Sequence, residues 1–272
     1  MMKKVAILFL LATVLAAFTF GQVSVKEELQ LTNVGGGNGG DLSPTFITTA
    51  DAAGAKELGP GSLGFAAELQ YKWALAGTPD GAAGDGGYAV GDNFLEVGYS
   101  LAAGPGTLRP FVRLHEVTNW RIGADYTDLA VGPVVLGFGA FFDYPVNSAK
   151  AFDGVDKEFI EAWITVSALD SRLNVKYAFD FGIGDVAGAD GTDSGVKKIV
   201  YLDVNFKVMD PLVVGLEVDD TGDSFEGFTL NPYANYSLSE NTTLGAHIAV
   251  KGINAPSGDI TFNPGVSISY TF

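Results

Sequence analysis

The sequence predicts an all-β protein whose strands form a closed antiparallel transmembrane β-barrel. The first observation is a period-two alternation of apolar and polar residues along most of the chain, as strands with one apolar face require. The second is that no run of eighteen apolar residues, long enough for a membrane-spanning helix, occurs after residue 20. The third is composition, because 36 of 272 residues are glycine and 12% are aromatic.

The first 21 residues have the organisation of a secretory signal peptide. A basic start with Lys3 and Lys4 precedes an apolar run from Val5 to Phe20, which is short for a membrane-spanning helix. Small residues before Gln22 predict cleavage at that point. We therefore expect residues 1–21 to be removed and residues 22–272 to form one barrel.

The expected mature chain is strongly acidic and contains no cysteine. Loss of residues 1–21 removes two of the 16 basic residues and none of the 32 acidic ones, so 14 remain against 32 and the net charge is −18. Nucleic-acid phosphates would be repelled by this charge, so no nucleic-acid partner is expected. Without cysteine, neither disulfide bonds nor a lipid-modified N-terminal cysteine is available.

Alternation is strongest from residue 62 onward. In residues 62–76 the apolar side chains from Leu63 to Leu75 occupy one face without a break, which is enough for a strand that crosses a bilayer. Before it, residues 22–33 form a strand interrupted by Glu27, and the glycine-rich stretch to residue 61 shows only a short β-like segment at 45–49. Further strands are expected at 95–101, 108–126, 134–144, 160–167, 173–183, 200–208, 212–218, 228–238, 244–250 and 260–272.

These segments predict about 12 strands, with 10 or 14 as alternatives. Later connections alternate between tight turns, at Asp170, 210–211 and 239–241, and longer loops rich in Asp, Gly and Ser, which is typical of transmembrane barrels. The even-numbered apolar parity from Leu108 to Tyr126 favours one long strand, because a two-residue turn would flip the phase.

If residues 108–126 form one strand and residues 22–33 are the first strand, the tight turn at 104–106 falls on the rim of the longer loops, against the alternation of the later connections. Splitting that strand repairs the order, still gives 12 strands and leaves residues 22–61 partly outside the wall, and both interpretations stay open.

The last strand resembles the C-terminal strand of bacterial outer-membrane β-barrel proteins of the porin-like class. In residues 260–272 apolar side chains alternate with small polar ones and end on an aromatic residue. In that class the terminal Phe is read by the barrel-assembly machinery. The resemblance implies an outer-membrane location in a Gram-negative-type envelope, with membrane lipid and that machinery as partners. It also implies an assembly signal, consisting of Phe262, Val266, Ile268, Tyr270 and Phe272.

The polar parity of each strand supplies the candidate functional residues, because it would face the lumen. Charged groups of both signs are interleaved there among Gly, Ser, Thr and Asn. The candidate pore-lining residues are Glu68, Lys72, Glu96, Arg109, Arg113, His115, Lys176, Asp180, Asp203, Lys207, Glu217, His247 and Lys251. Such charges either pair into a plug that fills a narrow barrel or face one another across water.

The expected function is that of a small porin, a channel for passive passage of small polar solutes or cations. The alternative is a non-conducting structural or surface-adhesion barrel that displays acidic loops. An enzyme is not expected, since the two inward histidines, His115 and His247, have neither a G-x-S-x-G nor an HExxH motif beside them. No cofactor is expected either, because the acidic loops at 184–195 and 219–226 lack the spacing of an EF-hand Ca²⁺ loop.

Overall fold

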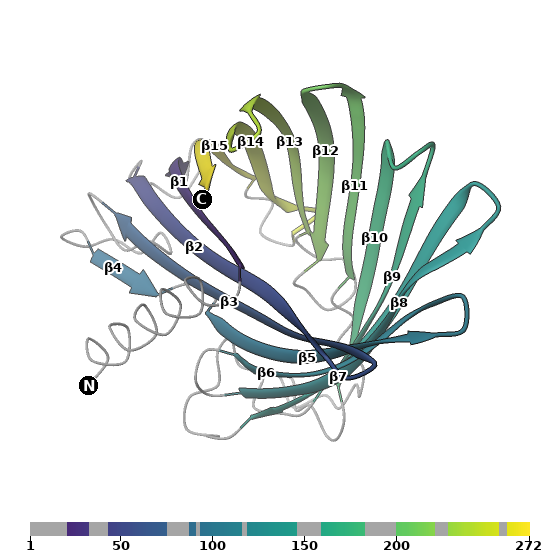
Figure 1. The fold of residues 1–272 in the computed structure, drawn as a ribbon. Helices are drawn as coiled ribbons and strands as arrows, with labels where there is room; N and C mark the ends of the chain where they lie inside the picture. The colour runs from purple at the N-terminus through teal and green to yellow at the C-terminus, as the bar shows by residue number, and fades with distance from the viewer. Residues whose placement is uncertain are drawn as a thin grey trace.

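A computed structural model shows one antiparallel sheet that closes on itself (Figure 1). It describes residues 21–32, 43–74, 87–90, 93–115, 119–145, 159–182, 200–220, 228–255 and 260–272. The strands are β1 (Gly21–Thr32), β2 (Ser43–Leu58), β3 (Gly61–Ala74), β4 (Gly87–Val90), β5 (Phe94–Ala103), β6 (Gly106–His115), β7 (Asn119–Val131), β8 (Val134–Pro145), β9 (Phe159–Ala168), β10 (Leu173–Gly182), β11 (Val200–Met209), β12 (Leu212–Asp220), β13 (Phe228–Ser239), β14 (Thr242–Ile253) and β15 (Thr261–Thr271). None of the described residues belongs to a helix long and apolar enough to cross a membrane.

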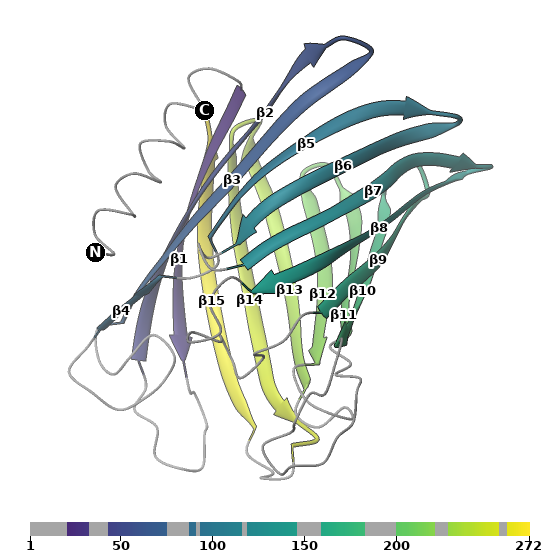
Figure 2. The same ribbon diagram turned by 90° about the horizontal axis from the view of Figure 1, so that it is seen from below.

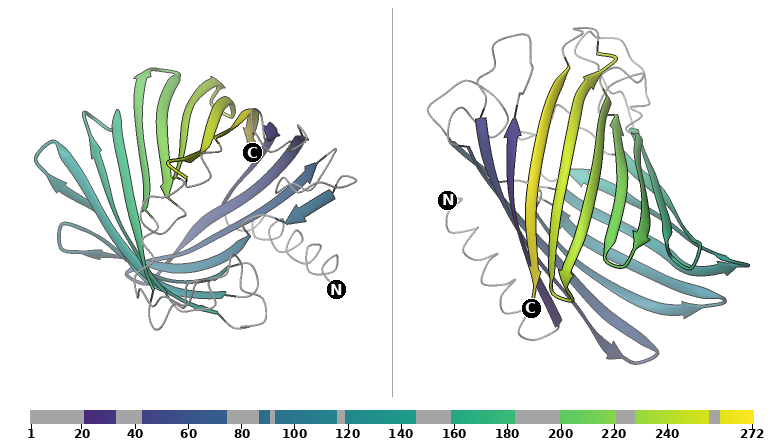
Figure 3. Two further views of the ribbon diagram at one scale, coloured as in Figure 1. Left: turned by 180° about the vertical axis from the view of Figure 1, so that it is seen from behind. Right: turned by 90° about the horizontal axis from the view of Figure 1, so that it is seen from above.

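Fourteen of the described strands form the closed wall. Each pairs with its neighbours in chain order, and β1 pairs with β15, so the first and last strands lie side by side (Figures 1 and 3). The four-residue β4 pairs only with residues 71–74 of β3, beyond the part of β3 that pairs with β5. Every strand of the wall therefore has two neighbours, and no sheet edge is left open among them.

The two rims of the barrel differ in their connections. Tight turns at 59–60, 104–105, 132–133, 169–172, 210–211 and 240–241 all lie on one rim, where β1 starts and β15 ends (Figure 3, right). The strand ends that the longer connections join lie on the other rim (Figure 2). The tight turns predicted at Asp170, 210–211 and 239–241 are confirmed.

The expected count of about 12 strands is wrong, and the alternative of 14 is correct. The strands β1 and β2 belong to the wall, since β1 pairs along its length with β2 and also with β15. The sequence missed most of β2 because its outer face carries small residues such as Ala50, Ala52 and Gly54 rather than large apolar ones. The weak signal reflects side-chain size and not a lack of pairing.

Of the two interpretations of residues 108–126, the single strand is wrong and the split is correct, because β6 and β7 are two strands of a hairpin. His115 pairs with Asn119 and Leu108 pairs with Tyr126, so three residues connect the strands. A connection with an odd number of residues returns the chain in the same parity, whereas the two-residue turn considered from the sequence would flip it. Alternation alone therefore cannot reveal this hairpin.

Glu27, which interrupts the apolar alternation of the first predicted strand, lies on the outer face opposite Ile268 of β15. Its carboxylate accepts a hydrogen bond of 2.9 Å from the hydroxyl of Thr48 on β2. A charged group that faces away from the barrel interior needs such a partner, because apolar surroundings penalise it. Thr48 on β2 thus compensates for the charge of Glu27 on β1, and these are the two strands with the weakest apolar alternation.

The outer face is apolar, as predicted, and aromatic rings lie near both of its ends. Trp73 and Tyr144 lie toward the rim of the longer connections, and each is about half exposed. Tyr126 lies toward the tight-turn rim, where its hydroxyl donates to the carbonyl oxygen of Ala103 at 2.8 Å. Such rings, apolar in body and polar at the tip, suit the two boundaries of a lipid layer.

We predict that the closed sheet makes the protein heat-modifiable. Closure satisfies the backbone hydrogen bonds that lipid or detergent cannot replace, so the barrel should resist denaturing detergent at room temperature. Unboiled and boiled samples should migrate differently on a denaturing gel, and the circular dichroism spectrum should be dominated by β structure. A compact monomer that is soluble without detergent would contradict the prediction.

Candidate functional site

The inner face of the barrel is identified by contacts across its curvature. The ring of Phe111 on β6 lies 6.4 Å from that of Trp163 on β9, although β7 and β8 separate the two strands. Such a contact is available only on the concave side of a curved sheet. The parity of these residues is the polar parity of the sequence, and the exposed large apolar side chains of β6, Leu108 and Val112, are on the opposite one. The inner face is therefore the candidate functional surface.

One part of the inner face, on β5 to β8, carries an arginine cluster, defined as Glu96, Arg109, Arg113, Arg121, Asp125 and Asp143. Glu96, only 3% exposed, accepts bonds from Arg109 at 2.6 Å and from Arg113 at 2.7 Å. Arg109 also binds Asp125 at 2.6 Å. Arg121, which is opposite Arg113 in the ladder, binds Asp143 at 2.6 Å. Glu96 and Asp143 thus offset the repulsion between the opposite guanidinium groups of Arg113 and Arg121.

Aromatic rings support the guanidinium groups of this cluster. Arg113 lies over the ring of Phe94 at 4.2 Å, and Arg121 lies over that of Phe141 at 4.7 Å. Phe141 in turn contacts Trp163, with ring centroids 6.0 Å apart. Cation–π contacts of this kind are strengthened where water is excluded, and Phe141 is almost fully buried. The cluster is therefore a packed, rigid part of the wall.

Rings elsewhere on the inner face lie flat over glycines of the neighbouring strand. Trp163 covers Gly139, Tyr233 covers Gly215 and His247 covers Gly265, and in each case a Cβ on the glycine would collide with ring atoms. Each of these three pairs is a direct cross-strand pair. A glycine lets the ring lie along the wall instead of projecting into the lumen. This gives the high glycine content a structural reason.

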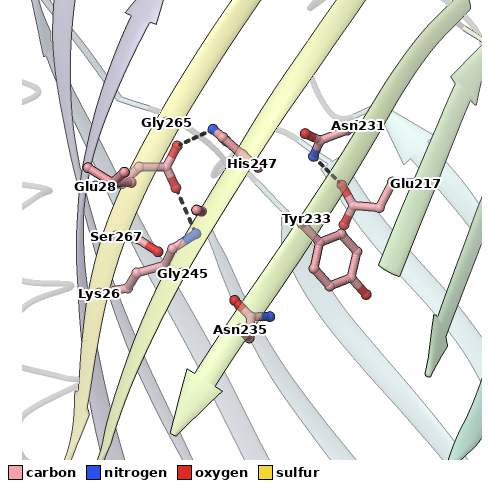
Figure 4. Close-up of a pocket in the computed structure, with 12 residues that line it drawn as sticks. Lys26, Glu28, Glu217, Asn231, Tyr233, Asn235, Gly245, His247, Gly265 and Ser267 are labelled. Carbon is pink, nitrogen blue, oxygen red and sulfur yellow. Dashed lines mark hydrogen bonds and ion pairs between the residues drawn. The ribbon is translucent and has the colours of Figure 1, made fainter. Parts of the chain in front are cut away.

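The part of the wall formed by β1 and β12 to β15 carries a polar cleft of about 400 Å³ (Figure 4). Glu28 accepts a bond from Lys26 at 2.7 Å and lies 3.5 Å from the Nε2 atom of His247. On the other side of the cleft, Glu217 accepts a bond of 2.7 Å from the amide of Asn231. The hydroxyl of Tyr233 donates to Asp203 at 2.9 Å.

All thirteen candidate pore-lining residues lie on described strands and on the polar parity, but only some come together. Glu96, Arg109 and Arg113 share the arginine cluster, whose ladder continues to His115. Lys176 is opposite Asp203, which is opposite Glu217. Lys207 pairs with Asp210 at the tight-turn rim. Glu68 and Lys72 lie on β3, Asp180 on β10 opposite Glu161, and His247 and Lys251 on β14.

Sequence reasoning missed several inner-face residues that make the key contacts. They are Lys26, Glu28, Arg121, Asp125, Asp143, Asn231 and Tyr233. For Arg121, Asp125, Asp143, Asn231 and Tyr233 the signal was present, because each lies between outward apolar residues, as Arg121 does between Trp120 and Ile122, whereas outward Glu27 obscures it for Lys26 and Glu28. The inward Phe111, Phe141 and Trp163 were missed because a polar inner face was expected.

The residues of the expected assembly signal lie on the outer face of β15 and at its end. Phe262, Val266, Ile268, Tyr270 and Phe272 are all exposed, Phe272 most of all at 72%. Residues 1–20, the loop at 184–195 and most of 219–226 lie outside the described residues. Within the described part of the chain, no group of three or more His, Asp or Glu side chains is placed to hold a metal ion.

Comparisons with known proteins identify the fold. No protein-family model and no curated sequence matches the chain. Its structure is similar to that of a multiple-site variant of the Rhodopseudomonas blastica porin, with a TM-score of 0.51 at 12% identity, covering 92% of this chain and 99% of that one. It is also similar to OccAB4 of Acinetobacter baumannii, with a TM-score of 0.50 at 10% identity, covering 92% and 97%. The chain therefore has a porin-like β-barrel fold.

We predict that Glu96→Gln destabilises the barrel. The change removes the buried charge that Arg109 and Arg113 share. Arg109 keeps Asp125, but the ion pair of Arg113 is broken, and breaking a buried pair typically costs about 3–5 kcal/mol. The temperature at which the folded gel band disappears should fall clearly. Glu57→Gln, at an exposed position beside a tight turn, is the matched control and should leave that temperature unchanged. Equal temperatures for both variants would contradict the role of the cluster.

Proposed function

We propose that this protein is an outer-membrane channel for passive passage of small polar solutes, with a mild preference for cations. The observation that carries the proposal is how the inner charges pair. The ion pairs of Lys26, Arg109, Arg113, Arg121 and Lys207 join side chains of one strand, of a strand and its turn, or of adjacent strands. The contact of His247 on β14 with Glu28 on β1 spans one strand. Charges that pair along the wall leave the centre of the barrel free for water.

The size of the barrel supports the same function. Barrels of eight strands are filled by their side chains, whereas those of 16 to 18 strands leave an aqueous channel. Fourteen strands lie closer to the second group. The flat rings over Gly139, Gly215 and Gly265 also keep bulky groups along the wall. The porin-like fold, the apolar outer face and the expected signal peptide together support an outer-membrane location.

The balance of charge on the described inner face favours cations. Twelve acidic residues have inward parity: Glu28, Asp51, Glu57, Glu68, Glu96, Asp125, Asp143, Glu161, Asp180, Asp203, Glu217 and Asp219. Eight basic residues share it: Lys26, Lys72, Arg109, Arg113, Arg121, Lys176, Lys207 and Lys251. The excess is small, so the local cation concentration should be raised only mildly.

We predict small, cation-preferring channels in a planar lipid bilayer. The preference should be modest at 0.1 M salt and fade at 1 M, because the screening length falls from about 10 Å to about 3 Å. Lys251→Gln removes an exposed basic group from the inner face and should raise the preference. The proposal fails if folded protein shows no conductance, which would favour a structural or adhesion barrel. Clear anion preference would show that the inner arginines outweigh the acidic groups.

We further propose that the C-terminal strand is read by the barrel-assembly machinery, and we predict that Phe272→Asp lowers the amount of assembled barrel in cells severalfold. Phe272 contacts Tyr270 at a centroid distance of 4.8 Å and is otherwise exposed, so its ring contributes little to the folded wall. Ser269→Asp, on the inner parity of the same strand, should have a smaller effect. Heat-modifiable protein in membranes is the measurement.

Refolding into detergent separates recognition from stability. Without the assembly machinery, Phe272→Asp should refold nearly as well as the unchanged chain, because the backbone N–H of residue 272 still donates to Val23 at 2.8 Å. A refolding defect as large as the defect in cells would show that the ring stabilises the barrel instead of being recognised.

A further inference from the structure

The polar cleft has the size and shape of a ligand site. Its volume of about 400 Å³ lies in the range of about 300–1,000 Å³ that is usual for small-molecule pockets. It opens on the inner face, and its two sides come from β1 and β14 on one hand and from β12 and β13 on the other (Figure 4). Any solute that passes through the barrel would pass this cleft.

The charged groups of the cleft are already partnered by the protein. Lys26 and His247 share Glu28 on one side, and Glu217 accepts from Asn231 on the other. Hydrogen-bonding capacity nevertheless remains. Each carboxylate has about four acceptor sites and the lysine ammonium three donors, of which these contacts use only some. The cleft therefore offers donors and acceptors in close proximity without an unpaired charge.

The signs of these charges select the class of ligand. An anion would meet Glu28 and Glu217, and a cation would meet Lys26, so either would face a like charge in the cleft. A neutral solute with several hydroxyl groups meets no repulsion, because each hydroxyl can both donate and accept. The mixture of partners thus fits a neutral polyhydroxylated molecule best.

Tyr233 supplies an apolar surface for the same ligand. One face of its ring lies against Gly215, so the other face is turned toward the cleft that the residue lines. An aromatic face with polar groups around it fits a ring that is apolar on its faces and polar at its rim. Gly245 keeps the bottom of the cleft free of a side chain, because a Cβ there would collide with Ser267 and lie 2.9 Å from Asn235.

We infer that the cleft is a weak binding subsite for a neutral saccharide of one or two rings on the route through the barrel. The route rests on the proposed channel function, whereas the site itself does not. Binding in a channel must be weak enough for release, so half-saturation is expected on the order of 1 mM or above. The subsite would favour entry of such solutes over charged ones of equal size.

The test measures saccharide-dependent block of ion current through the full-length barrel in a planar bilayer. Maltose and glucose should reduce the current in a saturable way. Tyr233→Ala should raise the half-blocking concentration about tenfold, equivalent to about 1.4 kcal/mol. Tyr201→Ala is the matched control, because it removes the same side chain from the inner parity of β11 outside the cleft. Both variants must show the heat-modifiable gel band.

A second measurement separates failure of the site from failure of the channel. Saturation-transfer NMR with maltose detects binding to the folded barrel in detergent without any conductance. Binding that is lost in Tyr233→Ala supports the subsite even if no current is seen, in which case the channel proposal fails. Conductance without saccharide block or NMR transfer overturns the subsite. Equal effects of the two tyrosine variants would show that the saccharide does not bind at this cleft. Stronger binding of the zwitterion L-serine than of maltose would overturn the proposed ligand class.

Discussion

The pairing of β1 with β15 is the constraint on which the rest of the structure depends. It joins residues 24–30 to residues 265–271 and turns a sheet of fourteen strands into a wall without an edge. Once the wall is closed, its two faces have different surroundings, and the period-two alternation sorts every side chain between them. The first strand is weak in apolar signal, but closure holds it between β2 and β15, and Thr48 of β2 donates a hydrogen bond to the outward Glu27.

Closure also creates a problem on the inside, because large side chains on the concave face crowd toward the axis. The structure resolves it in two ways. Rings such as Tyr233 and Trp163 lie flat over glycines of the adjacent strand, and charged groups such as Arg109 and Arg121 bind carboxylates on adjacent strands. Both devices keep side chains along the wall. Gly139, Gly215 and Gly265 therefore serve the packing of the inner face.

The class of fold, the direction of most side chains and several tight turns could be predicted from the sequence, because alternation is a local property. The number of strands could not, since the three-residue connection between His115 and Asn119 preserves parity and the small outer residues of β2 give little signal. The grouping of charges was also beyond reach, because it depends on register. The sequence places Arg113 and Arg121 on one face, but only the ladder sets them opposite each other with Glu96 and Asp143 beside them.

The inner face is asymmetric, and this asymmetry links the wall to its proposed function. On β5 to β9, buried ion pairs and rings such as Phe111 and Phe141 pack into a rigid layer. On β1 and β12 to β15, amides, carboxylates and the rings of Tyr233 and His247 surround an open cleft. A rigid side fixes the width of the lumen, whereas a polar side can exchange partners with a passing solute. Because solute contacts must form and break quickly for passage, the polar side is where selectivity among uncharged solutes would arise.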